Sequence, residues 1–327
     1  MAMQAPSVES RRVTLDVSEA GTESTEVGIR YAAAGESGDE PPVVLLHGIG
    51  LDSAAVSWRW ALPFLAADRR VLALDFPGHG ESDEPARNHT TPYYRAVLDA
   101  FLDALDVERA AFVGISMGGA VALGRALAAP ERVSRLVLVD SHGLGRDAPW
   151  RIPGFAALRT PFFDSVLETS LRDPLTVATS LRAMTVDPDD EFVADVRRAA
   201  AKAPAARALL SWQRSEFHAC GLRTCYLDRL DELAVPTLLI HGRDDPVFPV
   251  TWSARANERI EDSTFRAIDD CGHWPPRERP RQFNRVVGEF LTGEPATGRD
   301  RRALRPSSSN ASSLTIPSNR VLWSQMV

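Results

Sequence analysis

The stretch Gly114-Ile115-Ser116-Met117-Gly118-Gly119 decides how the rest of the chain is interpreted. It follows a short apolar run, 110–113, and precedes an alanine- and leucine-rich run, 120–127, so we expect a buried strand to end and a helix to begin at the serine. A serine on such a sharp turn takes strained backbone angles, and glycines two residues to either side avoid collisions with the turn. The stretch therefore fits the G-x-S-x-G pattern of a serine nucleophile between strand and helix.

A serine hydroxyl is a weak nucleophile unless a base takes its proton, so an acid and a histidine should follow downstream. Asp245 lies just after the apolar run 237–240, and His273 lies just after the run 264–268. In α/β sheets ligands bind beyond the carboxyl ends of strands, where both residues are expected. The order Ser116, Asp245, His273 therefore predicts a catalytic triad of nucleophile, acid and general base.

Other residues compete for these roles. Asp244 neighbours Asp245 and is expected to face solvent, whereas Asp140 ends another apolar run and is an alternative acid. His47 and His79 sit in glycine-containing turns and are expected to make structural hydrogen bonds.

The predicted site also needs amide donors and walls. The glycine-rich turn 47–50 follows an early strand, so the backbone amides of Ile49 and Met117 are the candidates for an oxyanion hole. Trp274 and His142 are the predicted substrate-binding residues. Five aromatic residues between the sheet segments are further candidates. Some of them would line the pocket, and most would form the core of the segment that carries them: Trp150, Phe155, Phe162, Phe163 and Trp212.

Short apolar runs alternate with helical patterns along the chain, which predicts a mostly parallel α/β sheet. The predicted strands are 43–46, 71–74, 111–115, 136–139, 237–240 and 264–268, and the predicted helices are 56–66, 92–105, 117–129, 252–260 and 280–292. Segments 12–17 and 27–32 alternate in polarity and are expected to form an antiparallel hairpin at one edge.

This alternation stops between 141 and 232, where helical runs and prolines replace strand candidates. We therefore expect an N-terminal extension (1–24), a core (25–140 and 233–293) and an inserted helical cap (141–232). Residues 294–327 are rich in Ser, Pro and Arg without a sustained period and predict a disordered tail.

Four sequence blocks resemble the α/β-hydrolase superfamily in its cap-bearing, esterase- and haloperoxidase-like branch: HGIG at 47–50, DFPGHGES at 75–82, GISMGG at 114–119, and HGRDDPVFP with CGHWP at 241–249 and 271–275. The resemblance covers residues 25–292. It implies an eight-stranded, mostly parallel α/β-hydrolase sheet flanked by helices, with Ser116, Asp245 and His273 as triad and Ile49 and Met117 at the oxyanion positions.

Composition excludes several other classes. The 327 residues are 44% hydrophobic with a net charge of −7, and no basic stripe suggests a nucleic-acid partner. The sequence shows no signal-peptide pattern and no membrane span, so we expect a cytoplasmic protein. Three scattered cysteines and seven scattered histidines predict no metal site, and no cofactor-binding glycine loop is present.

The sequence therefore predicts a serine esterase that cleaves a carboxylic ester of a small to medium, partly apolar molecule. Carbon–carbon bond hydrolysis, lactone hydrolysis and cofactor-free perhydrolysis use the same triad and stay open as alternatives. A small-molecule receptor with little turnover is the alternative of another class, because a fold does not fix a function. The oligomeric state is not predicted.

Overall fold

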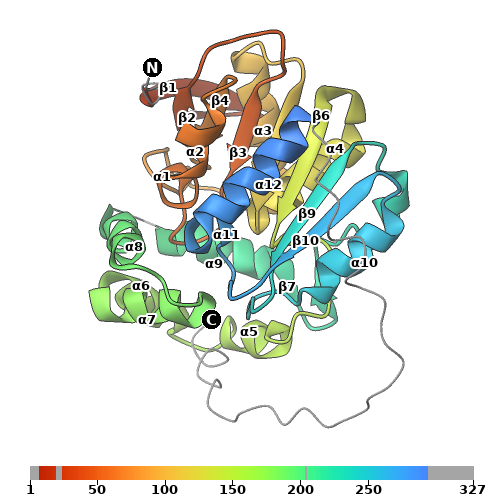
Figure 1. Ribbon diagram of the computed structural model, residues 1–327. Helices are drawn as coiled ribbons and strands as arrows, with labels where there is room; N and C mark the ends of the chain where they lie inside the picture. The colour runs from red at the N-terminus through yellow and green to blue at the C-terminus, as the bar shows by residue number, and fades with distance from the viewer. Residues whose placement is uncertain (1–6, 20–23, 203–204, 294–327) are drawn as a thin grey trace, which may run out of the picture.

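The computed structural model describes residues 7–19, 24–202 and 205–293 (Figure 1). Eight strands form one sheet in the order β1-β2-β4-β3-β5-β6-β9-β10. Their bounds are β1 Glu9–Val17, β2 Thr25–Ala34, β3 Val43–Leu46, β4 Val71–Leu74, β5 Ala110–Ile115, β6 Val133–Val139, β9 Thr237–Gly242 and β10 Ser263–Ile268. Each predicted strand is present, and neither end of any strand differs from its predicted position by more than three residues.

Within this sheet, the strands β4, β3, β5, β6, β9 and β10 pair in parallel in that order. Strand β2 pairs antiparallel with both β1 and β4. The predicted mostly parallel eight-stranded sheet and its edge hairpin are thereby confirmed. The segment 1–24, expected as an extension outside the core, contributes the edge strand β1. Leu15 and Val17 of this strand are buried in the core beside Val27 and Ile29, which explains why the strand belongs to the sheet.

Helices cover both faces of the sheet (Figure 1). One face packs on α3 (Thr91–Ala104), α4 (Met117–Ala128) and α10 (Thr251–Arg259). The other face packs on α1 (Ala54–Ser57), α2 (Ala61–Leu65) and α12 (Pro280–Thr292), with the short α11 (Pro275–Glu278) before α12. A short 3-10 helix, Pro130–Arg132, joins α4 to β6.

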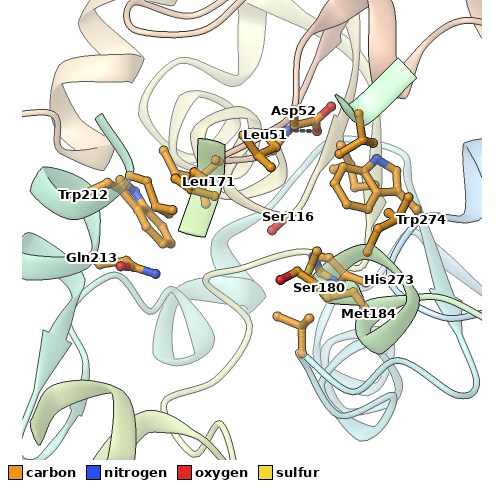
Figure 2. Close-up of a pocket in the computed structure, with 18 of the residues that line it drawn as sticks. Leu51, Asp52, Ser116, Leu171, Ser180, Met184, Trp212, Gln213, His273 and Trp274 are labelled. Carbon is orange, nitrogen blue, oxygen red and sulfur yellow. Dashed lines mark hydrogen bonds between the residues drawn. The ribbon is translucent and has the colours of Figure 1, made fainter. Parts of the chain in front are cut away.

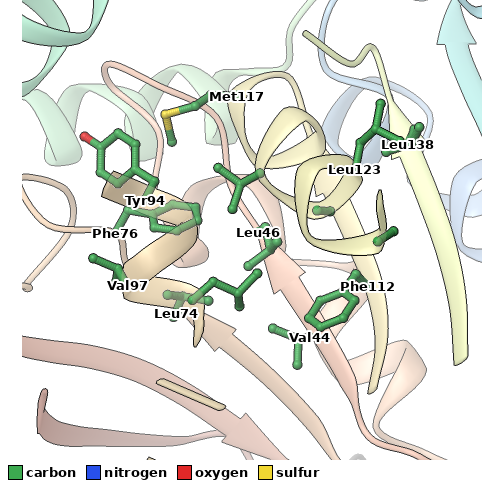
Figure 3. Close-up of a cluster of buried hydrophobic side chains, with 14 of the residues drawn as sticks. Val44, Leu46, Leu74, Phe76, Tyr94, Val97, Phe112, Met117, Leu123 and Leu138 are labelled. Carbon is green, nitrogen blue, oxygen red and sulfur yellow. The ribbon is translucent and has the colours of Figure 1, made fainter. Parts of the chain in front are cut away.

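Strand side chains alternate between these two layers, as the pleat requires. In β3, Val44 and Leu46 point to the layer of α3 and α4, whereas Val43 and Leu45 point to the layer of α2 and α12. Figure 3 shows the first layer, where Val44 and Leu46 meet Phe112 of β5 and side chains of α3 and α4. Burial on both faces explains why the central strands are continuously apolar.

One predicted helix was wrong in detail. The stretch 56–66 forms two short helices, α1 and α2, because the chain turns at Trp58, which ends α1 with φ −104° and ψ 14°. The turn buries the Trp58 ring completely, with its centroid 6.3 Å from that of Phe283 in α12. Burial of this large ring therefore overrides the continuous helical pattern.

An insertion of helices lies between β6 and β9, at the carboxyl edge of the sheet (Figure 1). Its helices are α5 Arg151–Ala157, α6 Phe163–Arg172, α7 Pro174–Met184, α8 Asp190–Lys202 and α9 Ala205–Glu216, followed by the 3-10 helix Leu227–Glu232. It also contains a two-stranded hairpin, β7 Phe217–His218 and β8 Gly221–Leu222, which the sequence did not predict. The predicted tail, 294–327, lies outside the described residues.

Among the helices of the described chain, none combines the length and the apolar character that crossing a bilayer requires.

A buried ion pair joins the insertion to the core. The Arg277 guanidinium donates to Asp195 Oδ2 of α8 at 2.8 Å and to the Val56 carbonyl of α1 at 2.6 Å. Both side chains are nearly inaccessible, with 1% and 7% of their surface exposed. Arg277 also lies 4.3 Å over the ring of Phe192. One side chain of α11 thus contacts both α1 and α8.

We predict that Arg277→Met lowers the free energy of unfolding by about 2 kcal/mol, because it removes the most buried of the three arginines that pair with Asp195 and leaves only the more exposed Arg59 and Arg198. Urea unfolding measures this. Arg285→Met, which removes an exposed pair with Glu289, is the control and should change stability by less than about 1 kcal/mol. Equal effects of the two substitutions would contradict the prediction.

Candidate active site

Ser116 occupies a strained turn between β5 and α4. Its backbone has φ 53° and ψ −119°, and its amide donates to the Val139 carbonyl of β6 at 2.9 Å. A Cβ on Gly114 would lie 2.4 Å from the Gly118 carbonyl oxygen, and one on Gly118 would lie 2.3 Å from the Leu46 carbonyl oxygen. Backbone therefore packs on backbone around this turn, as the glycine spacing predicts.

Asp245 and His273 are brought together by loops that follow β9 and β10. His273 Nδ1 donates to Asp245 Oδ2 at 2.8 Å, and Asp245 Oδ1 accepts from the amides of Val247 at 2.7 Å and Phe248 at 3.3 Å. Burial opposes ionisation of Asp245, but its contacts with His273 and His241 more than offset this and hold its pKa well below the usual range. Asp245 is therefore an ionised carboxylate that fixes the ring of His273.

Ser116 and His273 line the same pocket (Figure 2). No hydrogen bond joins their side chains within the described structure, so the geometry pairs the acid with the histidine and places the serine beside them. Catalytic hydrogen bonds are often long without substrate and shorten when it binds.

The rival acids lie elsewhere. Asp244 is exposed. Asp140 is fully buried, with φ 41°, and its Oδ1 accepts from the Gly242 amide at 2.8 Å, so it supports the end of β9. Burial raises its pKa well above the usual range. Side-chain oxygen and nitrogen atoms of Asp140, Asp245 and His273 that could bind a metal lie within 4.8 Å of one another. The hydrogen bonds of Asp140 with Gly242 and of Asp245 with His273 account for this proximity.

His241 is a neighbour of the acid that the sequence did not single out. Its Nε2 lies 3.3 Å from Asp245 Oδ2, 3.4 Å from Asp140 Oδ1 and 3.1 Å from the Phe248 carbonyl oxygen. Burial opposes its charge, but the two carboxylates raise its pKa above the usual value. It begins the HGRDDPVFP block, and the only signal for it was its spacing of four residues before Asp245.

The candidate oxyanion amides have a distinctive environment. In the turn after β3, the Gly48 amide donates to Asp52 at 2.6 Å and the Gly50 amide donates to His79 Nε2 at 3.3 Å. Between them, the Ile49 amide donates to no acceptor among the described residues, and the same holds for the Met117 amide at the start of α4. Both amides therefore lack a protein acceptor, and Ile49 lines the pocket, whereas Met117 is fully buried and is not among its lining residues.

His47 and His79 hold this turn in place. His47 Nδ1 donates to the Gly48 carbonyl at 2.6 Å, and its Nε2 accepts from the Phe76 amide at 2.9 Å. His79 Nδ1 donates to the Pro77 carbonyl at 3.1 Å. Burial lowers the pKa of His79 to about 4, so the ring is neutral and accepts from Gly50.

Asp52 is a pocket residue that the sequence reasoning missed. Its carboxylate accepts from the Gly48 amide, from the Ser53 amide at 2.7 Å and from Ser57 Oγ at 2.7 and 2.8 Å. Burial raises its pKa to about 6, although these hydrogen bonds act in the other direction. It lies four residues after Gly48, but nothing in the sequence distinguished it from a surface aspartate.

The pocket is a cavity of about 170 Å³ between the sheet edge and the insertion. Its walls are mainly apolar, and Trp274 is among them as predicted. Of the five aromatic candidates in the insertion, Trp150 and Trp212 line the pocket, whereas Phe155, Phe162 and Phe163 do not. Two polar side chains from the insertion, Ser180 and Gln213, also line it, and no motif predicted them.

His142 was predicted to bind substrate and does not line the pocket. It is fully buried behind the wall, where its ring lies 5.2 Å from Trp212 and 5.7 Å from Phe248. Its Nε2 donates to Glu216 Oε2 at 3.1 Å. The prediction failed because the His142 ring is held by Glu216 of α9, behind the pocket wall.

Comparison with known proteins places the chain among hydrolases. A family model described as the alpha/beta hydrolase fold matches residues 41–280. The 2-hydroxy-6-oxo-2,4-heptadienoate hydrolase of Pseudomonas putida is 33% identical over 83% of this chain and 98% of its own. The 2-hydroxy-6-oxo-6-phenylhexa-2,4-dienoate hydrolase of Comamonas testosteroni is 30% identical over 78% and 89%. A solved meta-cleavage product hydrolase from Pseudomonas fluorescens superposes with a TM-score of 0.68, at 28% identity over 86% of this chain and 98% of that one.

The raised pKa of Asp52 predicts a pH-dependent stability. The folded protein binds the Asp52 proton more tightly than the unfolded chain, so this group's contribution falls as pH rises from about 4 to about 6. Asp52→Asn lacks this titrating group. The free energy of unfolding of the variant minus that of wild type should therefore increase by about 3 kcal/mol from pH 4 to pH 7. Urea unfolding across this range measures the difference. Parallel curves would contradict the prediction, and the exposed Asp39→Asn is the control.

Proposed function

Because the chain belongs to the α/β-hydrolase fold family, we propose that Ser116, His273 and Asp245 are its catalytic triad and that it hydrolyses a carbon–carbon bond beside a ketone. The observation that carries the triad is the hydrogen bond from His273 Nδ1 to a fully buried, ionised Asp245 in a pocket that also presents Ser116. We further propose that the insertion, 141–232, acts as a cap over this pocket.

The chemistry follows from the residues. A donated Nδ1 proton leaves the lone pair of His273 Nε2 to take the proton of Ser116 as the serine oxygen attacks a carbonyl carbon. Asp245 keeps this tautomer and stabilises the imidazolium that forms. The negative oxygen of the tetrahedral intermediate is bound by the amides of Ile49 and Met117, and each such donor typically contributes about 3 kcal/mol.

The second half of the reaction releases both products. The intermediate collapses by breaking the bond to the leaving carbon, which takes the proton from His273 and leaves an acyl group on Ser116. His273 then activates a water molecule that attacks this ester and restores the serine. One water molecule is consumed, and the products are a carboxylic acid and the protonated leaving group. A carbon leaving group needs conjugation that delocalises its electron pair.

The relatives support carbon–carbon cleavage rather than the carboxylic ester that the sequence analysis preferred. A 2-hydroxy-6-oxo-dienoate contains no ester, so its hydrolysis must break a carbon–carbon bond. The preference for an ester rested on the apolar residues of the insertion, which set the size and polarity of the pocket and not the bond that is broken. The substrate is a small molecule in either case.

The first test is covalent labelling. A fluorophosphonate probe should label Ser116, located by peptide mass spectrometry, and Ser116→Ala should abolish labelling. Wild-type protein should also bleach the absorbance of 2-hydroxy-6-oxo-6-phenylhexa-2,4-dienoate or of its methyl ester, with p-nitrophenyl esters run alongside. Turnover of esters alone would move the function to esterase. Labelling without turnover of any of these probes would favour a receptor.

The two buried aspartates provide a matched pair. Asp245→Asn should lower kcat by about 10⁴-fold, because the histidine loses the partner that sets its tautomer. Asp140→Asn should lower kcat by less than about tenfold, because an amide oxygen still accepts from Gly242. The ketone assay measures both variants. The reverse order of effects would transfer the acid role to Asp140.

A further inference from the structure

The polar groups of the pocket are few and unevenly distributed. Apart from Ser116 and His273, the polar side chains that line it are Asp52, Ser180 and Gln213. The described lining contains no lysine and no arginine, whereas it includes the carboxylate of Asp52. The remaining walls are aliphatic or aromatic, with tryptophans at 150, 212 and 274.

Gln213 has an unsatisfied acceptor. Its side chain is 4% exposed, and its Oε1 is enclosed without a hydrogen-bond partner in the described structure. Figure 2 shows Gln213 on the side of the pocket opposite Ser180, Met184 and His273, with Ser116 between the two sides. Figure 2 draws the amide nitrogen of Gln213 on the pocket side and its oxygen behind, so a half rotation of the amide presents Oε1 to the pocket. Buried polar groups are nearly always hydrogen-bonded, so this unpaired acceptor at a pocket wall is a recognition group for a ligand.

Charge in this pocket acts against anions. A carboxylate that enters an apolar cavity loses its water and needs a cation or several donors in return. Here the fixed charge nearest the Ile49 turn is that of Asp52, which is negative when ionised, and its hydrogen bonds are already made with Gly48, Ser53 and Ser57. A neutral ligand avoids both the desolvation and the repulsion.

We propose that this pocket selects an uncharged ketone or ester that carries a hydroxyl or N–H donor for Gln213 and an apolar group of about the size of one ring. An apolar cavity of about 150 Å³ accommodates benzene, so a cavity of about 170 Å³ has room for such a group. The inference rests on the proposed function, because it concerns the substrate at that same site. It separates this chain from its relatives, whose substrates are named as dienoates and therefore carry a carboxylate.

The test compares two ligands that differ in charge and by one methyl group. These are 2-hydroxy-6-oxo-6-phenylhexa-2,4-dienoate and its methyl ester, titrated by calorimetry into the Ser116→Ala variant at pH 7.5. The methyl ester should bind at least tenfold more tightly than the acid. Binding is measured without turnover, so a wrong assignment of the reaction leaves this result intact, and the turnover assays test the reaction separately.

Variants of Gln213 test the recognition group. In the Ser116→Ala background, Gln213→Leu should weaken binding of the methyl ester about five- to tenfold. Gln213→Arg should strengthen binding of the acid and bring the two affinities within about threefold of each other. Arg214→Leu, which alters the next residue of α9 and removes its pair with Asp164, is the control and should leave the preference unchanged.

Equal affinities, tighter binding of the acid, or no binding of the ester at millimolar concentration would overturn the proposal. An unchanged affinity in Gln213→Leu would overturn the role of Gln213. Thermal melting of each variant shows whether it is folded, so a loss of binding in a folded variant reports on recognition.

Discussion

The contact between backbone and backbone at Gly114, Gly118 and Leu46 is the constraint on which this site depends. Positions 114 and 118 lie so close to neighbouring carbonyl oxygens that a methyl group at either would collide with main chain. Main chain cannot move aside as the end of a flexible side chain can. The strained angles of Ser116 are therefore held from both sides, and its hydroxyl is presented at the carboxyl edge of the sheet.

Hydrogen bonds connect this edge into one unit. Asp52 binds the Gly48 amide and Ser57 Oγ, and Ser57 Oγ accepts from the indole of Trp274, which adjoins His273. The turn that presents the Ile49 amide and the loop that presents His273 are thus joined through three side chains, those of Asp52, Ser57 and Trp274. From the other side, the Met184 carbonyl of the insertion accepts from the His273 amide at 2.9 Å. His273 is therefore positioned by both core and insertion.

Three buried aspartates show that burial alone does not set a charge. Asp52, Asp140 and Asp245 are all removed from water, and burial opposes ionisation in each. The pKa rises for Asp52 and Asp140, and it falls only for Asp245, which has imidazoles on two sides. A carboxylate with that pairing can support a histidine base, which is why we propose as the acid Asp245, which follows β9, rather than Asp140, which follows β6.

The sequence by itself determined the sheet, the turn at Ser116 and the two residues, Asp245 and His273, that we propose as acid and base. These features depend on local patterns: continuous apolar runs, glycines at fixed spacing and charged residues just beyond strand ends. The antiparallel edge hairpin was also local, since its side chains alternate in polarity. In each of these cases the physical cause acts within about ten residues.

Only the tertiary structure decided what surrounds the proposed triad. Gln213 and Ser180 reach the pocket because α9 and α7, distant in sequence, pack over the sheet edge, and Asp52 reaches it from the turn after β3. His142 is excluded because Glu216 of α9 binds its ring. The break between α1 and α2 likewise follows from the burial of Trp58 against α12. Polarity and shape of a cavity arise from side chains contributed by many segments, so no local pattern encodes them.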